Sequence, residues 1–222
     1  RELTDQQIWS AEDIIAASGS PVLAMIPHIK GRARRAMGTL VAEGPCTDAG
    51  NEFRKILAHL GAFWVGGAGT VRSCLVTSPG WGDGKTSIAC NLAISLAQSG
   101  RRVLLMEVSP RGGVEQALGM VPTRGLSEIL AAASGPAEDE VATLRPTAFK
   151  GLFVLGAGLD ADMLSIRVAS REMAELVEQA SQNFDHVIID TPPFLALAEA
   201  RLLALMVDGV LLVAGAGVST LG

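Results

Sequence analysis

The chain of 222 residues is 49% hydrophobic and 18% charged, and its net charge is −5. This balance excludes an intrinsically disordered chain, since there is ample apolar surface for a core, and it argues against a general nucleic-acid-binding protein, which needs a basic face. The three cysteines form neither a CxxC pair nor a metal-like cluster, which favours a reducing compartment over a disulfide framework. No apolar run reaches the roughly 20 residues of a membrane span. Because the first residue is Arg1 rather than Met, we expect a fragment of a longer protein.

Residues 1–45 are predicted to form an N-terminal arm and a first strand that pack on the core. Ser10 is placed to cap a short helix that runs to Ile15, with Asp13 as the acid of a capping box. The apolar run Val22–Ile26 predicts a buried strand. The basic stretch His28–Met37 allows two interpretations: a solvated loop, or a segment attracted to an anionic membrane surface.

Residues 46–222 are predicted to form one domain, whose fold we expect to continue beyond Gly222. Continuous apolar runs are typical of buried parallel strands, and helical patterns alternate with them. We therefore expect an α/β fold, a mostly parallel central sheet flanked by helices on both faces. The predicted strands are Cys74–Thr77, Val103–Met106, Val187–Ile189 and Val210–Ala214, and the predicted helices are Asn51–Leu60, Ser87–Gln98 and Ile166–Ala180.

The strongest motif is Thr77–Thr86, which follows an apolar strand and opens a helix, as a phosphate loop does. Its glycines let backbone amides turn toward phosphate oxygens, and the helix N-terminus adds positive charge. Lys85 is placed to reach the β- and γ-phosphates, and the Thr86 hydroxyl to bind Mg²⁺. The strict GxxxxGK[ST] pattern fails only at Pro79. The predicted nucleotide-binding residues are Gly80, Gly82, Asp83, Gly84, Lys85, Thr86 and Ser87.

Two further residues of this motif region invite interpretation. Trp81 either lies over the nucleotide or is simply an exposed aromatic residue on the loop. Asp190 ends the apolar strand His186–Asp190, and a carboxylate there can hold Mg²⁺, often through a water molecule. The alternative for Asp190, an aspartate that only caps a turn, is less favoured because a phosphate loop lies upstream.

Several segments carry a family resemblance: Pro21–Pro27 reads PVLAMIP, Gly125–Leu130 reads GLSEIL and Phe184–Pro193 reads FDHVIIDTPP. In their residues and in their order along the chain, these segments resemble motifs of the cytoplasmic domain of bacterial tyrosine kinases (BY-kinases), which belong to the MinD/ParA-like P-loop group. The resemblance implies bound Mg-ATP or ADP and a link to capsule or exopolysaccharide export. It also implies a transmembrane polysaccharide co-polymerase segment, in the same or a partner chain, and a place at the cytoplasmic face of the inner membrane. Carried over by position, it implies catalytic Lys85, Glu107, Arg111 and Asp190, and Mg²⁺ ligands Thr86, Glu107 and Asp190.

The departures from the family are equally informative. The family's second acidic motif, DxD, here reads Glu107 and Ser109, so one carboxylate is longer and the other is missing. The family's ring-forming helix motif, ExxRxxR, reads Asn51, Arg54 and Leu57, and we therefore expect no closed ring of the family type. The chain contains no tyrosine, so it cannot phosphorylate itself on tyrosine.

Four functions remain in view. The favoured one is a degenerate kinase, a nucleotide-binding domain with weak or no phosphoryl transfer that regulates an export machine. The second is an active tyrosine autokinase or ATPase that tolerates Glu107 and whose tyrosine tail lies outside the chain. The third, a ParA/MinD-type positioning ATPase, is disfavoured because the signature lysine of that group falls on Gly80. A domain that binds no ligand is the least favoured, given the Gly-Lys-Thr sequence in its strand–helix context.

Overall fold

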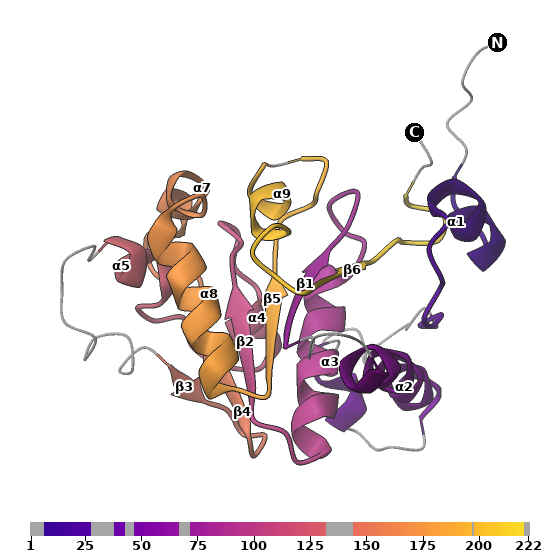
Figure 1. Cartoon of the computed structure of the whole chain (residues 1–222), viewed down its shortest axis with the longest axis horizontal. Coiled ribbons are helices and arrows are strands. Elements are labelled where there is room, and N and C mark those ends of the chain that lie inside the picture. The colour runs from indigo at the N-terminus through magenta and orange to yellow at the C-terminus, as the bar shows by residue number, and fades with distance from the viewer. Residues whose placement is uncertain are drawn as a thin grey trace, which may run out of the picture.

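The computed structural model describes residues 7–27, 38–42, 47–66, 72–131, 144–196 and 198–219. Its centre is a six-stranded sheet in the order β3-β4-β2-β5-β1-β6, as Figure 1 shows. All neighbouring strands are parallel except β3 and β4, which are antiparallel. The strands are β1 (Ser73–Thr77), β2 (Val103–Glu107), β3 (Arg145–Pro146), β4 (Leu152–Leu155), β5 (His186–Asp190) and β6 (Gly209–Leu212). The prediction of a mostly parallel sheet is confirmed.

The three central strands β1, β2 and β5 are buried at every position. Their side chains alternate between two cores, because successive residues of a strand point to opposite faces of a sheet. Cys74 and Val76 of β1 belong to the core under α2 (Asp48–Gly66) and α3 (Lys85–Gln98). Leu75 belongs to the core on the other face, under α8 (Arg171–Asn183). Burial on both faces explains why these strands read as unbroken apolar runs.

Shorter helices complete the two layers (Figure 1). The first core also takes Val114 from α4, and the second takes residues from α5, α7 and α9. The bounds of these helices are α4 (Val114–Ala117), α5 (Leu126–Ala131), α7 (Leu164–Arg167) and α9 (Glu199–Leu203), with the 3-10 turn η2 (Ala161–Met163) before α7. In the described part of the chain, no helix combines the length and apolar character needed to cross a bilayer.

Two of the predicted elements need correction. The helix predicted over Ile166–Ala180 is two helices, α7 and α8, because the chain breaks at Ser170, whose Oγ accepts from the Met173 N–H and caps α8. The strand predicted over Val22–Ile26 is wrong, since no ladder forms there. The segment nevertheless packs against the first core through Leu23, Ala24 and Ile26. Its apolar pattern therefore reflects burial and not strand pairing. The basic stretch 28–37 lies outside the described residues, and the domain boundary at 45–46 stays a prediction.

The N-terminal helix α1 (Ala11–Ser18) confirms the predicted capping box, with Ser10 and Asp13 bonded reciprocally. Just before it, Ile8 pairs with the C-terminal segment: its N–H donates to the Ser219 carbonyl at 3.0 Å, and its carbonyl accepts from the Gly217 N–H at 2.8 Å. Figure 1 accordingly shows α1 beside the yellow C-terminal trace. The two ends of the described chain are therefore joined at one place.

Candidate nucleotide-binding site

The phosphate loop connects the end of β1 to the start of α3. Gly82 and Gly84 have φ values of 90° and 91°, a left-handed conformation that favours glycine. Gly84 is the N-cap of α3, and no side chain caps the helix there. The first N–H groups of α3 therefore stay available to an external acceptor, and the helix dipole favours a negatively charged one.

Asp83 fixes the loop from within. Its Oδ2 accepts from the Gly80 N–H at 3.0 Å, and its Oδ1 accepts from the Ser219 hydroxyl at 2.9 Å. Asp83 and Gly80, both predicted as nucleotide-binding residues, thus bond to each other. The Ser219 contact was not predicted, and it links the phosphate loop to the C-terminal segment that Ile8 holds.

The Trp81 ring lies against two cations. Arg111 places its Cζ 4.0 Å from the ring centroid, and Lys85 places its Nζ 5.0 Å from it. Lys85 is itself buried, and this burial lowers the pKa of its ammonium group, while Asp190 and Asp83 oppose the shift. Trp81 therefore contacts two of the predicted site residues, although its ring is still partly exposed.

Asp190 and Thr86 form the polar centre of the site. Thr86 Oγ1 donates to Asp190 Oδ2 at 2.7 Å, which confirms that the two predicted residues meet. Asp190 is fully buried, and its second oxygen, Oδ1, has no hydrogen-bond partner. Burial raises the pKa of this carboxyl to about 7, against the bond from Thr86 and the charge of Lys85. A buried, unsatisfied carboxylate oxygen beside a hydroxyl fits a hydrated divalent cation.

Glu107 faces Asp190 across the neighbouring strands, where the two are register partners. Its Oε1 accepts from the Val114 N–H at 2.9 Å, so the longer side chain reaches the start of α4. Burial raises the pKa of Glu107 to about 8, and the charges of Asp190 and Glu115 add to the rise. Ser109, the second departure from the family motif, is also buried and supplies no carboxylate.

Gly113 lies between the two halves of the site. A Cβ atom there would come 3.6 Å from Thr86 Cγ2 and 3.7 Å from Glu107 Oε1. Its φ of 147° is a conformation that side chains rarely adopt. This glycine therefore allows the loop after β2 to approach the phosphate loop closely.

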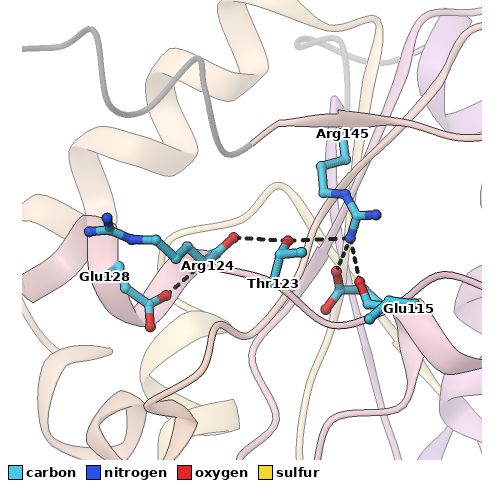
Figure 2. Close-up of polar contacts among 7 residues, drawn as sticks. Glu115, Thr123, Arg124, Glu128 and Arg145 are labelled. Atoms are coloured by element: carbon cyan, nitrogen blue, oxygen red, sulfur yellow. Dashed lines mark hydrogen bonds and ion pairs between the residues drawn. The ribbon is translucent and has the colours of Figure 1, made fainter.

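An ion pair between Arg145 and Glu115, which the sequence did not reveal, lies next to the turn that binds Glu107; Figure 2 shows the pair. Arg145 of β3 donates to Glu115 Oε1 at 2.7 Å and to the Val121 carbonyl at 2.6 Å. Glu115 is only 4% exposed and follows Val114, whose N–H holds Glu107. Burial raises the pKa of Glu115, and Arg145 opposes the rise. The ion pair thus anchors the α4 turn on which Glu107 depends.

Figure 2 also shows Glu128, which is separated from this pair by Thr123 and Arg124. Its Oε2 accepts from the Gly125 N–H at 2.7 Å, and its Oε1 accepts from the N–H groups of Leu159 and Asp160. Glu128 therefore joins the start of α5 to the loop after β4, whereas Glu115 joins α4 to β3. No local sequence signal marks Arg145, because its partner lies 30 positions earlier.

The predicted site residues thus form one group at the carboxyl ends of β1, β2 and β5, with Ser87 in the first turn of α3 and Arg111 at the loop's outer side. Within the described residues, no cluster of three or more His, Cys, Asp or Glu side chains forms an all-protein metal site. A cation here needs oxygen atoms from the ligand and from water in addition, as Mg²⁺ does in nucleotide sites.

Comparisons with known proteins agree with this geometry. The profile of the family described as "AAA domain" matches residues 76–217. The chain is 34% identical over 148 residues to tyrosine-protein kinase YwqD of Bacillus subtilis, covering 66% of this chain and 61% of that protein. It is 33% identical over 199 residues to tyrosine-protein kinase wzc of Salmonella typhi, covering 88% of this chain and 27% of that protein. The chain therefore spans less than two thirds of these relatives.

Solved structures give the same result at the level of the fold. The kinase domain of Escherichia coli tyrosine kinase ETK has a TM-score of 0.82 at 26% identity, covering 96% of this chain and 85% of that chain. The septum site-determining protein MinD from Pyrococcus horikoshii, solved with Mg-ADP, has a TM-score of 0.55 at 25% identity, covering 64% of this chain and 57% of that chain. The chain thus belongs to the AAA domain family, with the fold of a MinD/ParA-like P-loop protein. Within that class it is a domain of the bacterial tyrosine kinase type, as the sequence resemblance predicted.

Proposed function

We propose that this domain binds ATP or ADP with Mg²⁺ at residues 79–87. The observation that carries the proposal is the pair of Thr86 and Asp190 beneath the phosphate loop, where a buried carboxylate oxygen has no protein partner. Lys85 binds the β- and γ-phosphates, and the free amides at the start of α3 bind the phosphate oxygens. Thr86, Asp190 and Glu107 hold the Mg²⁺ ion, which neutralises charge on the phosphates when bound.

We further propose that phosphoryl transfer by this domain is weak or absent. Transfer depends on positioning and charge neutralisation, so a displacement of about 1 Å can cost roughly 10²-fold in rate. Here Glu107 is held by the Val114 N–H, and Ser109 cannot replace the second carboxylate of the family motif. The active-kinase alternative is supported by the intact Lys85, Thr86 and Asp190.

The wider role that follows from the family is regulation of capsule or exopolysaccharide synthesis and export. In this proposal the domain acts at the cytoplasmic face of the inner membrane, next to a transmembrane polysaccharide co-polymerase segment in the same or a partner chain. It binds no nucleic acid. The support is the similarity to tyrosine-protein kinases along most of the chain.

We also propose that the domain does not close the family's ring. Asn51 bonds to Arg54, and Glu52 pairs with Lys55 at 2.5 Å, so the nearest acid to the motif position is already engaged. Leu57 packs against the first core instead of offering a charge to a neighbour. Light scattering at micromolar concentration should show no stable octamer, and a stable octamer would refute this.

Calorimetry of nucleotide binding tests the proposed site. Lys85→Ala should weaken Mg-ATP binding at least tenfold, about 1.4 kcal/mol, because the cation for the phosphates is lost. Lys150→Ala is the matched control, since this lysine lies exposed in the turn before β4. Equal affinities for the two variants would remove the assignment.

A substrate assay distinguishes the degenerate kinase from the active one. Because the chain has no tyrosine, a tyrosine peptide must be supplied in trans. The double replacement Glu107→Asp with Ser109→Asp should raise turnover tenfold or more, about 1.4 kcal/mol in the barrier. Robust phosphotyrosine formation by the unmodified domain would favour the active-kinase alternative.

A further inference from the structure

Among the described residues, Trp81 is the side chain that Arg111 is seen to contact. Its guanidinium lies 4.0 Å from the ring centroid, and among the contacts of the described residues it makes no hydrogen bond or ion pair. A planar guanidinium that stacks on an aromatic ring keeps its N–H donors free at its edges. The contact therefore orients this cation without using any of the donors that an anion would need.

The position of this cation relates it to one end of a bound nucleotide. Lys85, the residue for the β- and γ-phosphates, shares the same ring at 5.0 Å. Arg111 follows Glu107 by four positions, in the loop that leads from β2 toward α4. The Trp81 ring thus contacts two cations, Lys85 at the end of the phosphate loop and Arg111 in the loop that follows β2.

We infer that Trp81 is a positioning residue that holds Arg111 at the mouth of the phosphate loop, where the guanidinium contacts the terminal phosphate of a nucleoside triphosphate. The inference rests on the proposed nucleotide site and goes beyond it, because it assigns the preference for triphosphate over diphosphate to this stacked pair. Planar, bidentate recognition of phosphate is the task for which arginine is suited. A diphosphate lacks the group that Arg111 would contact.

The test is calorimetric affinity for Mg-ADP and for the Mg²⁺ complex of a β,γ-imido ATP analogue. Trp81→Leu and Arg111→Gln should each weaken binding of the analogue about fivefold to tenfold and binding of ADP less than twofold, a scale set by cation–π and charge-assisted bonds. Trp81→Phe keeps an aromatic face and should retain most of the affinity. The double variant Trp81→Leu/Arg111→Gln should be no weaker than Arg111→Gln alone, because the ring acts through the arginine.

Arg102→Gln is the matched control. Arg102 also stacks on aromatic rings, those of Phe153 and Phe184, but it precedes β2 at the opposite end of the strands. This variant should leave both affinities unchanged. A second measurement follows the contact itself: with Trp9→Phe and Trp64→Phe in the background, Arg111→Gln should shift the emission of Trp81 without any nucleotide.

The possible results distinguish a failure of nucleotide binding from a failure of the proposed role of Trp81. If the unmodified protein binds neither nucleotide, the proposed function fails and the inference fails with it. If both nucleotides bind and Trp81→Leu weakens them equally, the ring lies over the nucleotide itself and the inference alone is overturned. Unchanged affinities, or an unchanged emission spectrum, would overturn it as well.

Discussion

The aspartates at the two ends of the central strands differ in their hydrogen bonding and in the direction in which their pKa values are shifted. At the amino end, Asp208 accepts three hydrogen bonds of 2.8 Å, from the Arg72 N–H, the Ser73 N–H and the Ser73 hydroxyl. Burial would raise the pKa of Asp208, but these bonds outweigh it and hold the pKa below its usual range. At the carboxyl end, the Asp190 carboxylate accepts one hydrogen bond from the described residues, donated by the Thr86 hydroxyl, and burial raises its pKa to about 7.

This difference is consistent with the proposed nucleotide site at the carboxyl end of the sheet and with a structural role for the acid at the amino end. A buried polar group normally has its partners within the protein, and each exception calls for an explanation. Asp190 is such an exception, because its buried Oδ1 has no hydrogen-bond partner among the described residues, and it lies where a parallel sheet places its ligands, at the carboxyl ends of the strands. Burying this carboxylate without a second partner costs free energy of folding, and a bound cation would recover that cost by satisfying the free oxygen.

The pH dependence of stability should expose the difference most strongly. The folded protein keeps protons on Asp190 and Glu107 that the unfolded chain releases above about pH 4.5. Their contribution is complete below that pH and is lost as the pH rises through their folded pKa values of about 7 and 8. Without metal or nucleotide, the free energy of unfolding should fall on the order of 4 kcal/mol from pH 5 to pH 8.

Urea denaturation in the presence of a chelator measures this fall. His186 acts in the opposite direction, because burial lowers its pKa to about 4, so its contribution increases with pH only up to its unfolded pKa of about 6.5. Glu107→Gln should remove the larger share of the fall between pH 6.5 and pH 8, because Asp190, with a folded pKa of about 7, has already lost most of its proton in the lower part of that range. A flat or rising profile over that range would contradict the contrast between the two ends.

Removing the acid at the amino end should be the next largest effect. Asp208→Ala deletes three bonds to a charged acceptor and should cost about 3 kcal/mol of unfolding free energy. Asp185→Ala is the matched control at the same end, because it removes a carboxylate that accepts from the Arg102 N–H, and it should cost about 1 kcal/mol. Equal losses in urea denaturation would show that Asp208 is no special anchor.

The Arg145–Glu115 pair lies between these extremes, since it is a satisfied pair next to the binding end. Arg145→Met leaves Glu115 buried without its cation and should cost about 2 kcal/mol, less than a fully buried pair because Arg145 is partly exposed. Adding Glu115→Gln should recover part of the loss, because the unpaired charge is removed. Thermal denaturation of the single and double variants measures these changes in stability. A double variant less stable than Arg145→Met would contradict the idea that the unpaired charge of Glu115 causes the loss.

The smallest effect should come from the hydroxyl that completes the Asp208 anchor. Ser73→Ala removes one bond donated to Asp208 and one accepted from its N–H, at a cost of about 1 kcal/mol. Ser181→Ala, which removes a bond within one helix to the Val177 carbonyl, is a suitable control. A cost near zero would place the whole anchor in the backbone N–H groups.

The sequence predicts the binding end well, because its signals are local. The Gly82 and Gly84 turns, the lysine and the strand ending in Asp190 all occur within short segments. The same holds for the buried strands, whose apolar runs require no knowledge of their partners. Val22–Ile26 was misread because an apolar run records burial, whether or not a neighbouring strand is there to bond it.

Contacts between distant segments could not be predicted in this way. Arg145 and Glu115 are separated by 30 positions, and Ser219 and Asp83 by 136. Trp81 gave an ambiguous signal, because its cations come from two different loops that only the fold brings together. Such pairings depend on the order of the strands, which hydrophobic periodicity does not encode.

That order also has a consequence for how the chain acquires its structure. The first strand of the sheet along the chain, β1, is flanked by β5 and β6. Ser73 therefore pairs with Val187, and Cys74 pairs with Gly209, both more than 100 positions later in the sequence. During synthesis the apolar β1 leaves the ribosome long before either neighbour exists. A topology dominated by such distant pairings folds slowly, over roughly milliseconds to seconds, and exposes apolar strands to aggregation meanwhile. Production of this domain should therefore depend on chaperones and on temperature more than its finished stability suggests.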